Sequence, residues 1–130
     1  MKKAKRKIDV TIEKTDTGYS AYADDLNVFT TAKDITSLHR NMIEGINLYY
    51  EEKGFFIEED NIRLHLDLKQ FFRYYKVLNA KFLASRIGMN PTLLSQYVRG
   101  NKRPSSKQTN KIIQGIQSIG KELMDIELLS

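Results

Sequence analysis

The sequence predicts an α+β protein in which a β-β-β-α-β domain precedes an all-α domain. Apolar residues follow a strand period and then one helical period in the first half, whereas the second half holds only helical periods. The net charge also differs between the two halves of the chain. Residues 1–68 hold ten Lys or Arg and thirteen Asp or Glu, a net of −3, and residues 69–130 hold eleven and three, a net of +8. We therefore expect domains at residues 1–66 and 67–130.

The first domain opens with three expected strands. Apolar and polar residues alternate over residues 8–12, which is typical of a half-buried strand. Asp16-Thr17-Gly18 is a turn sequence, so residues 19–23 form the return strand. Residues 28–32 are β-branched and aromatic, which favours a third strand.

A helix and a fourth strand complete this domain. The apolar residues that follow recur every three or four positions, on one face of a helix: Ile35, Leu38, Met42, Ile46 and Tyr49. Asp34 is placed to cap the start of this helix, and Gly54 to end it. After an acidic turn at residues 58–60, residues 62–66 alternate again. The crossover through the helix is long enough for this last strand to pair in parallel.

Composition excludes several classes of protein. The chain has 130 residues, 41% hydrophobic and 28% charged, which is typical of a globular protein. It has no cysteine, so disulfides and Cys-based metal sites are excluded. The basic start MKKAKRK leads into an alternating pattern and not into the apolar core of a signal peptide, and no run approaches the length of a membrane span. We expect a cytoplasmic protein with no membrane partner.

The residues of the first domain give little support for catalysis. His39 and His65 are the only histidines, too few for a zinc site with a recognisable spacing. Asp9, Glu44 and Asp67 could in principle hold Mg²⁺ together, but solvated surface carboxylates are the simpler interpretation. The sequence has no Gly-rich phosphate loop and no evident Ser nucleophile. We expect no enzyme, no metal and no cofactor.

The second domain predicts a helix-turn-helix. Residues 67–75 form a first helix, whose stripe of Leu68, Phe71, Phe72 and Tyr75 belongs to the core. Two short helices follow, capped by Asn79 and by Asn90 with Pro91, and Gly100 closes the second. A small residue at the crossing, a Gly in the turn and apolar residues around them are what two such helices need. These structural residues are Leu83, Ala84, Ile87, Gly88, Met89, Leu94 and Tyr97.

The outer face of the second motif helix predicts DNA reading. Gln can pair with adenine, Arg with guanine, and Ser or Thr with either kind of base. The expected base-reading residues are Thr92, Ser95, Gln96 and Arg99. The expected phosphate contacts are Lys81, Asn90, Lys102, Arg103 and Lys107. No acidic residue occurs from Lys69 to Lys121, so nothing in this stretch would repel a duplex.

The last helix should begin at Ser105, which fits a capping box with Gln108. Its apolar stripe exceeds what one small domain can cover, so we assign Ile116, Ile119 and Leu123 to a dimer surface. A single motif makes few base contacts, and a homodimer or higher oligomer would bind an operator with an inverted repeat.

The two halves of the chain resemble two known protein families. The segment from Asp67 to Ser105, with "LASRIG", "LLSQYVRG" and "RPS", resembles the lambda-repressor-like (Xre/Cro) helix-turn-helix family. That family often has a phosphate-contacting Gln at the start of the first motif helix, where this chain has Ala80 beside Lys81. The first half, with "IEKTDTGYSAYADDL", is similar to the HicB antitoxin family, whose N-terminal domain is a degenerate RNase H-like fold. That family commonly has Pro-Gly where this chain has Asn27-Val28.

The resemblance implies a type II antitoxin. Its first domain would bind and neutralise a small HicA-type mRNA-cleaving toxin, and its second would repress the shared operon on double-stranded DNA. An acidic domain suits a basic RNA-binding toxin. One alternative is a stand-alone transcriptional regulator whose first domain serves as a sensor or assembly module, with no toxin. A nuclease that uses the carboxylates of the first domain is the third and least supported.

Overall fold

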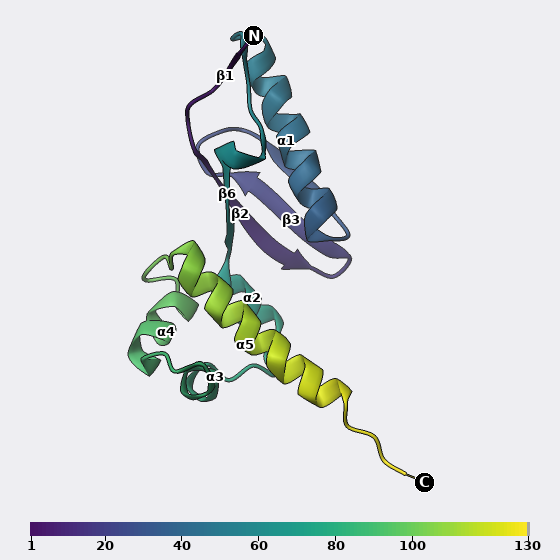
Figure 1. The fold of residues 1–130 in the computed structure, drawn as a ribbon, viewed down its shortest axis with the longest axis vertical. Helices are drawn as coiled ribbons and strands as arrows, with labels where there is room; N and C mark the ends of the chain where they lie inside the picture. Colours follow the sequence, from purple (N-terminus) through teal and green to yellow (C-terminus); the bar gives the residue numbers. More distant parts are fainter. Residues whose placement is uncertain (130) are drawn as a thin grey trace. The chain divides into compact units, whose positions relative to one another are not determined.

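The computed structural model describes residues 1–129, and over them the chain is α+β, with five α-helices and two small sheets (Figure 1). It divides into two compact units, Met1–Phe71 and Phe72–Ser130, which we call the first and second units. The division falls inside α2 (Leu68–Tyr74), somewhat later than the boundary expected after residue 66.

The first unit contains the four strands that the sequence predicts. They are β2 (Ile8–Thr15), β3 (Gly18–Ala23), β4 (Phe29–Ala32) and β6 (Ile62–Leu66), in the sheet order β4-β3-β2-β6. Strand β3 is antiparallel to both β2 and β4, and β6 is parallel to β2. The parallel pairing predicted for the last strand is therefore confirmed.

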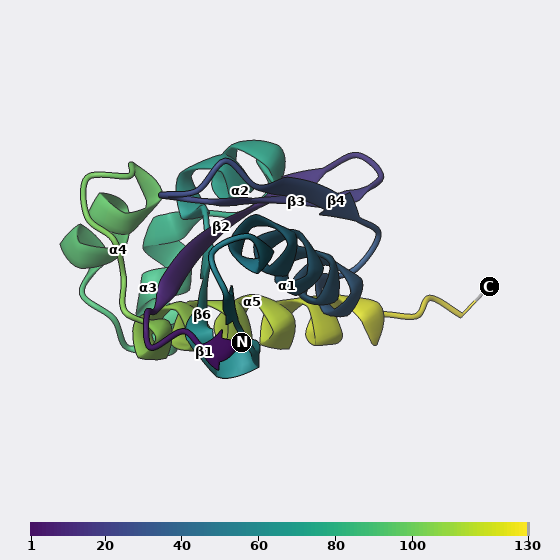
Figure 2. The ribbon, with the colours of Figure 1, turned by 90° about the horizontal axis from the view of Figure 1, so that it is seen from above.

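Helix α1 (Ile35–Glu51) covers one face of this sheet, as the view along its axis shows (Figure 2). Its buried residues Leu38, Met42, Ile46 and Tyr50 share a core with the inward-facing residues of β2 and β3. The Asp34 cap is confirmed, since its Oδ1 accepts a hydrogen bond from Ser37 N at 2.7 Å. The helix ends at Glu51, before Gly54, which lies in the following turn at φ +76°.

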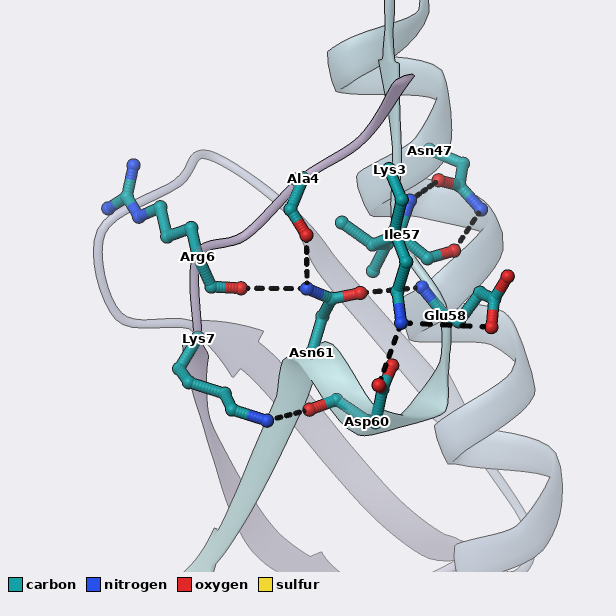
Figure 3. Close-up of polar contacts among 9 residues, drawn as sticks. All are labelled: Lys3, Ala4, Arg6, Lys7, Asn47, Ile57, Glu58, Asp60 and Asn61. Atoms are coloured by element: carbon teal, nitrogen blue, oxygen red, sulfur yellow. Dashed lines mark hydrogen bonds and ion pairs between the residues drawn. The ribbon is translucent and has the colours of Figure 1, made fainter. Parts of the chain in front are cut away.

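Two short strands of the first unit were not predicted from the sequence. They are β1 (Lys2–Lys3) and β5 (Phe55–Phe56), which pair in parallel. The acidic turn expected at residues 58–60 is a 3₁₀ turn, η1, over Glu59–Asn61. The side chain of Asn61 is buried and joins these segments (Figure 3). Its amide Nδ2 donates to the carbonyls of Ala4 at 2.8 Å and Arg6 at 2.9 Å, so it fixes the start of the chain.

The second unit is helical. After α2 come α3 (Ala80–Ile87), α4 (Pro91–Val98) and α5 (Ser106–Met124), the long last helix in Figure 1, and α5 packs against α3. In the stripe assigned to the core, Leu68 and Phe72 are buried and Phe71 and Tyr75 are half-buried. Within residues 1–129, no helix combines the length and the apolarity that crossing a membrane requires.

Candidate nucleic-acid interface

Helices α3 and α4 pack together through the apolar residues that were predicted to form the core of the helix-turn-helix. Ala84 and Leu94 are fully buried, and Leu83, Met89 and Tyr97 are nearly so, while Ile87 is half-buried. The small side chain of Ala84 lets the two helices approach, and the larger apolar groups fill the space around it. Burial of this set fixes the orientation of α4, and with it the face that α4 presents to solvent.

The ends of both helices are closed by short polar contacts. Asn79 Oδ1 accepts from Phe82 N at 2.9 Å, and Asn90 Oδ1 accepts from Thr92 N at 2.8 Å, with Pro91 as the first residue of α4. Gly88 ends α3 in the left-handed region, at φ +68°, which Gly adopts without steric cost. Met89 N then donates to Ala84 O at 3.0 Å, which closes the turn between the helices.

Helix α5 packs against α3. A Cβ atom on Gly115 would lie 2.3 Å from Ile87 Cγ2 and 3.2 Å from Leu83 Cδ1, so α5 packs against α3 at a distance that only Gly allows. Ile112, one turn earlier, is fully buried. Ser105 caps the start of α5, since its Oγ accepts from Gln108 N at 3.2 Å, which confirms the N-cap half of the expected capping box.

Four polar residues lie on the side of α4 away from Leu94 and Tyr97. Thr92 is exposed, and Ser95 and Gln96 are half-buried within the helix. Arg99 follows the last helical residue as its C-cap, with an exposed side chain. Residues three or four apart share a helix face. The structure therefore brings these four residues together in one row, with Arg99 at the C-terminal end.

Basic residues come before and after this row in the chain. Lys81, Lys102, Arg103 and Lys107 are all exposed. Asn90 already uses its side-chain oxygen as the α4 cap, so only its amide nitrogen could reach a phosphate. The second unit holds ten Lys or Arg against three acids, a net of +7.

The acids of the second unit lie away from α4 in the sequence. They are Glu122, Asp125 and Glu127, and Glu122 pairs with Arg86. Among residues 1–129, Lys81, Lys102 and Lys107 form no ion pair. Their charges are therefore available to an external anion.

The residues assigned to a dimer surface lie on the C-terminal half of α5. Ile116 and Ile119 are half-buried, and Leu123 is 60% exposed. The chain beyond them carries further exposed apolar side chains: Met124, Ile126, Leu128 and Leu129. This end of α5 leaves more apolar surface in water than the rest of the helix.

The titratable residues of the first unit do not gather as a metal site; in residues 1–129 no three His, Asp or Glu side chains are placed to hold an ion. Asp67 Oδ1 accepts from Gln70 N at 3.0 Å at the start of α2, and Glu44 is exposed on α1. Asp9 lies between two side chains of β6, 2.8 Å from His65 Nε2 and 3.0 Å from Arg63 Nε. The His65 hydrogen bond, followed by the Arg63 contacts, lowers the pKa of Asp9 below its ordinary value.

The contact between Asp9 and His65 was not predicted from the sequence. It arises because β2 and β6 pair in parallel, with Asp9 opposite Arg63 and Thr11 opposite His65. The other histidine, His39, is half-buried on α1.

Comparisons of this chain with protein-family models, with curated proteins and with solved structures found no match.

Proposed function

We propose that this chain is a HicB-like type II antitoxin that also represses transcription. In this proposal the second unit is an Xre/Cro-like helix-turn-helix domain that binds an operator, and the first unit, a degenerate RNase H-like domain, binds and blocks a small basic HicA-type toxin. The protein itself is not an enzyme, needs no cofactor and acts in the cytoplasm. The β-β-β-α-β order, with β6 parallel to β2, supports the resemblance for the first unit.

The observation that carries the DNA-binding role is the polar row on α4 with its basic surroundings. A helix of this size fits the major groove, where Gln96 and Arg99 have the donors and acceptors to read adenine and guanine edges. Lys81, Lys102 and Lys107 carry charges that no acid of the described chain neutralises. They would contact phosphates and set the position of the helix without reading sequence.

Selection of bound duplexes from a random pool tests this role. The full-length protein should enrich an inverted repeat, with half-sites about 10 base pairs apart, because two-fold dimers place two recognition helices one helical turn apart. Arg99→Ala should relax the preference at one base position of each half-site. Lys121→Ala, which removes an exposed cation from the last turn of α5, is the matched control and should leave the enriched sequence unchanged. Failure to enrich any sequence would refute the proposal for the second unit.

The toxin-binding role rests on the resemblance and on charge. Residues 1–68 carry a net of −3, but five of their ten cations lie in residues 2–7, so residues 8–68 hold five Lys or Arg against thirteen Asp or Glu, a net of −8 that suits a basic partner. Co-expression with the product of the neighbouring reading frame, followed by purification through a tag on that product, tests it. We expect a stable complex in which the RNA cleavage by the partner is blocked.

The same experiment separates the antitoxin from the stand-alone regulator. If the protein binds its operator but no small basic product co-purifies with it, the regulator with a sensor or assembly domain is the correct assignment. Binding of the neighbouring product by the first unit separates the two hypotheses, since both assign DNA binding to the second unit.

A further inference from the structure

An open groove lies on the first unit, between α1 and β5. Its volume is about 550 Å³, and its lining is mostly apolar: Met1, Glu44, Asn47, Leu48, Glu51, Phe55 and Phe56. Leu48 is 71% exposed and Phe55 is 41% exposed. Neither contributes to the buried core of the unit. Exposed apolar side chains that face each other from a helix and a neighbouring strand are typical of a binding groove.

The walls of the groove are held in place by two asparagines. Asn47 on α1 binds both sides of the Ile57 backbone: its Oδ1 accepts from Ile57 N at 2.7 Å, and its Nδ2 donates to Ile57 O at 3.3 Å. Asn61 clamps the segment before β2 and also accepts from Glu58 N at 2.9 Å (Figure 3). Because β1 pairs with β5, both clamps act on the same wall. A ligand would therefore meet a groove that is already formed, which lowers the cost of binding.

The charges at the groove favour a cationic ligand. Glu44 and Glu51 lie on the same face of α1 as Leu48, one turn to either side of it. Two nearby lysines have other partners, since Lys53 Nζ lies 3.1 Å from the Tyr49 hydroxyl and Lys3 Nζ lies 2.7 Å from Asp60, whereas Lys2 lies in register with Phe55. Two carboxylates on either side of an apolar floor would repel the phosphates of a nucleic acid.

We propose that this groove binds a segment of a basic protein, with one apolar side chain between Leu48 and Phe55 and Lys or Arg side chains against Glu44 and Glu51. The inference deepens the proposed neutralising role of the first unit and rests on that role for the biological partner. The apolar contact supplies the affinity, and the two carboxylates select the charge of the ligand.

Synthetic peptides test the chemistry without any knowledge of the partner. The ¹⁵N-labelled full-length protein is titrated with three peptides of equal length, one of alternating Lys and Leu blocks, one with Ser in place of Leu and one with Glu in place of Lys. The Lys-Leu peptide should shift the amide signals of Asn47, Leu48 and Phe55. The other two should bind at least about tenfold more weakly, because each lacks one of the two contacts.

Variants of the protein locate the contact. Leu48→Ser should weaken binding of the Lys-Leu peptide by about tenfold or more without loss of fold, because it removes the apolar contact, adds no charge and changes an exposed side chain. Phe29→Ser, at another exposed apolar residue of the first unit, is the matched control and should leave the affinity unchanged. Lys2→Glu should tighten binding, since Lys2 lies in register with Phe55 and adds a like charge beside the ligand.

Several results would overturn the inference. Equal affinity for the three peptides, or shifts confined to other parts of the chain, would show that the groove does not select a basic apolar segment. Shifts of the groove signals with protein concentration alone would assign it to a second copy of this chain. If a neighbouring product co-purifies and Leu48→Ser leaves that complex intact, the groove inference fails while the antitoxin role stands. If the peptide occupies the groove but no product co-purifies, the antitoxin role fails and the groove stands.

Discussion

The two glycines in α5 provide a direct test of how α5 packs against α3. At Gly120 an added Cβ meets nothing within 4 Å, so Gly120→Ala should stabilise the second unit by about 1 kcal/mol through helix propensity alone. At Gly115 the same propensity gain applies, but the Cβ would lie 2.3 Å from Ile87 Cγ2. Ile87 is β-branched and cannot rotate away easily, so overpacking should cost about 1–3 kcal/mol. The free energies of unfolding of the two variants should therefore differ by about 1–3 kcal/mol.

Urea unfolding followed by NMR measures this difference within one unit. The amide signals of Ala84 and Leu94 report the second unit, and that of Val10 reports the first, which should keep its midpoint in both variants. The reasoning is refuted if Gly115→Ala and Gly120→Ala change the stability of the second unit equally, because α5 would then not approach α3 closely.

Three further predictions concern the rest of the molecule. Asn61→Ala should destabilise the first unit by about 1–3 kcal/mol in urea unfolding, because the carbonyl of Ala4 and the amide of Glu58 lose their partner; an unchanged midpoint would argue against the clamp. The pKa of Asp9 is lower in the folded protein than its ordinary value of 3.8, so the ionised carboxylate contributes stability above pH 3.8, and this contribution is lost as the pH falls through the folded pKa. The difference in unfolding free energy between wild type and Asp9→Asn should therefore close below about pH 3.8. A difference that does not depend on pH would contradict this. Ile119→Asp should give a monomer by light scattering, with its helical circular dichroism retained and specific DNA binding lost; unfolding of the variant would instead place Ile119 in the core.

Much of the fold was predictable because its signals are local in the sequence. Asp34, Asn79 and Asn90 each cap a helix that begins at the next residue, so a capping residue before an apolar period was enough to place those starts. Gly88 supplies the left-handed turn for the same reason. The row on α4 follows from helical spacing alone once the buried side is fixed by Leu94 and Tyr97.

The features that the sequence did not predict all depend on distant partners. Strand β1 is two exposed lysines with no strand pattern, and it forms only because β5 lies beside it. Asn61 looks like an ordinary turn residue until the fold brings the Ala4 and Arg6 carbonyls to it. The contact of Asp9 with His65 likewise requires the parallel register of β2 and β6, and the walls of the groove require both β5 and α1.

The most direct test of the central claim, that the second unit reads DNA with α4, is a titration of the selected duplex at several salt concentrations. Gln96→Ala should weaken binding by about 1–3 kcal/mol on the selected sequence while it leaves the salt slope unchanged, because it removes a base contact and no charge. Lys102→Ala should weaken all sequences alike and lower the salt slope by about one, as the loss of one phosphate contact requires. Gln117→Ala, at an exposed Gln of α5, should change neither quantity. Equal effects of Gln96→Ala on selected and random duplexes would contradict the account.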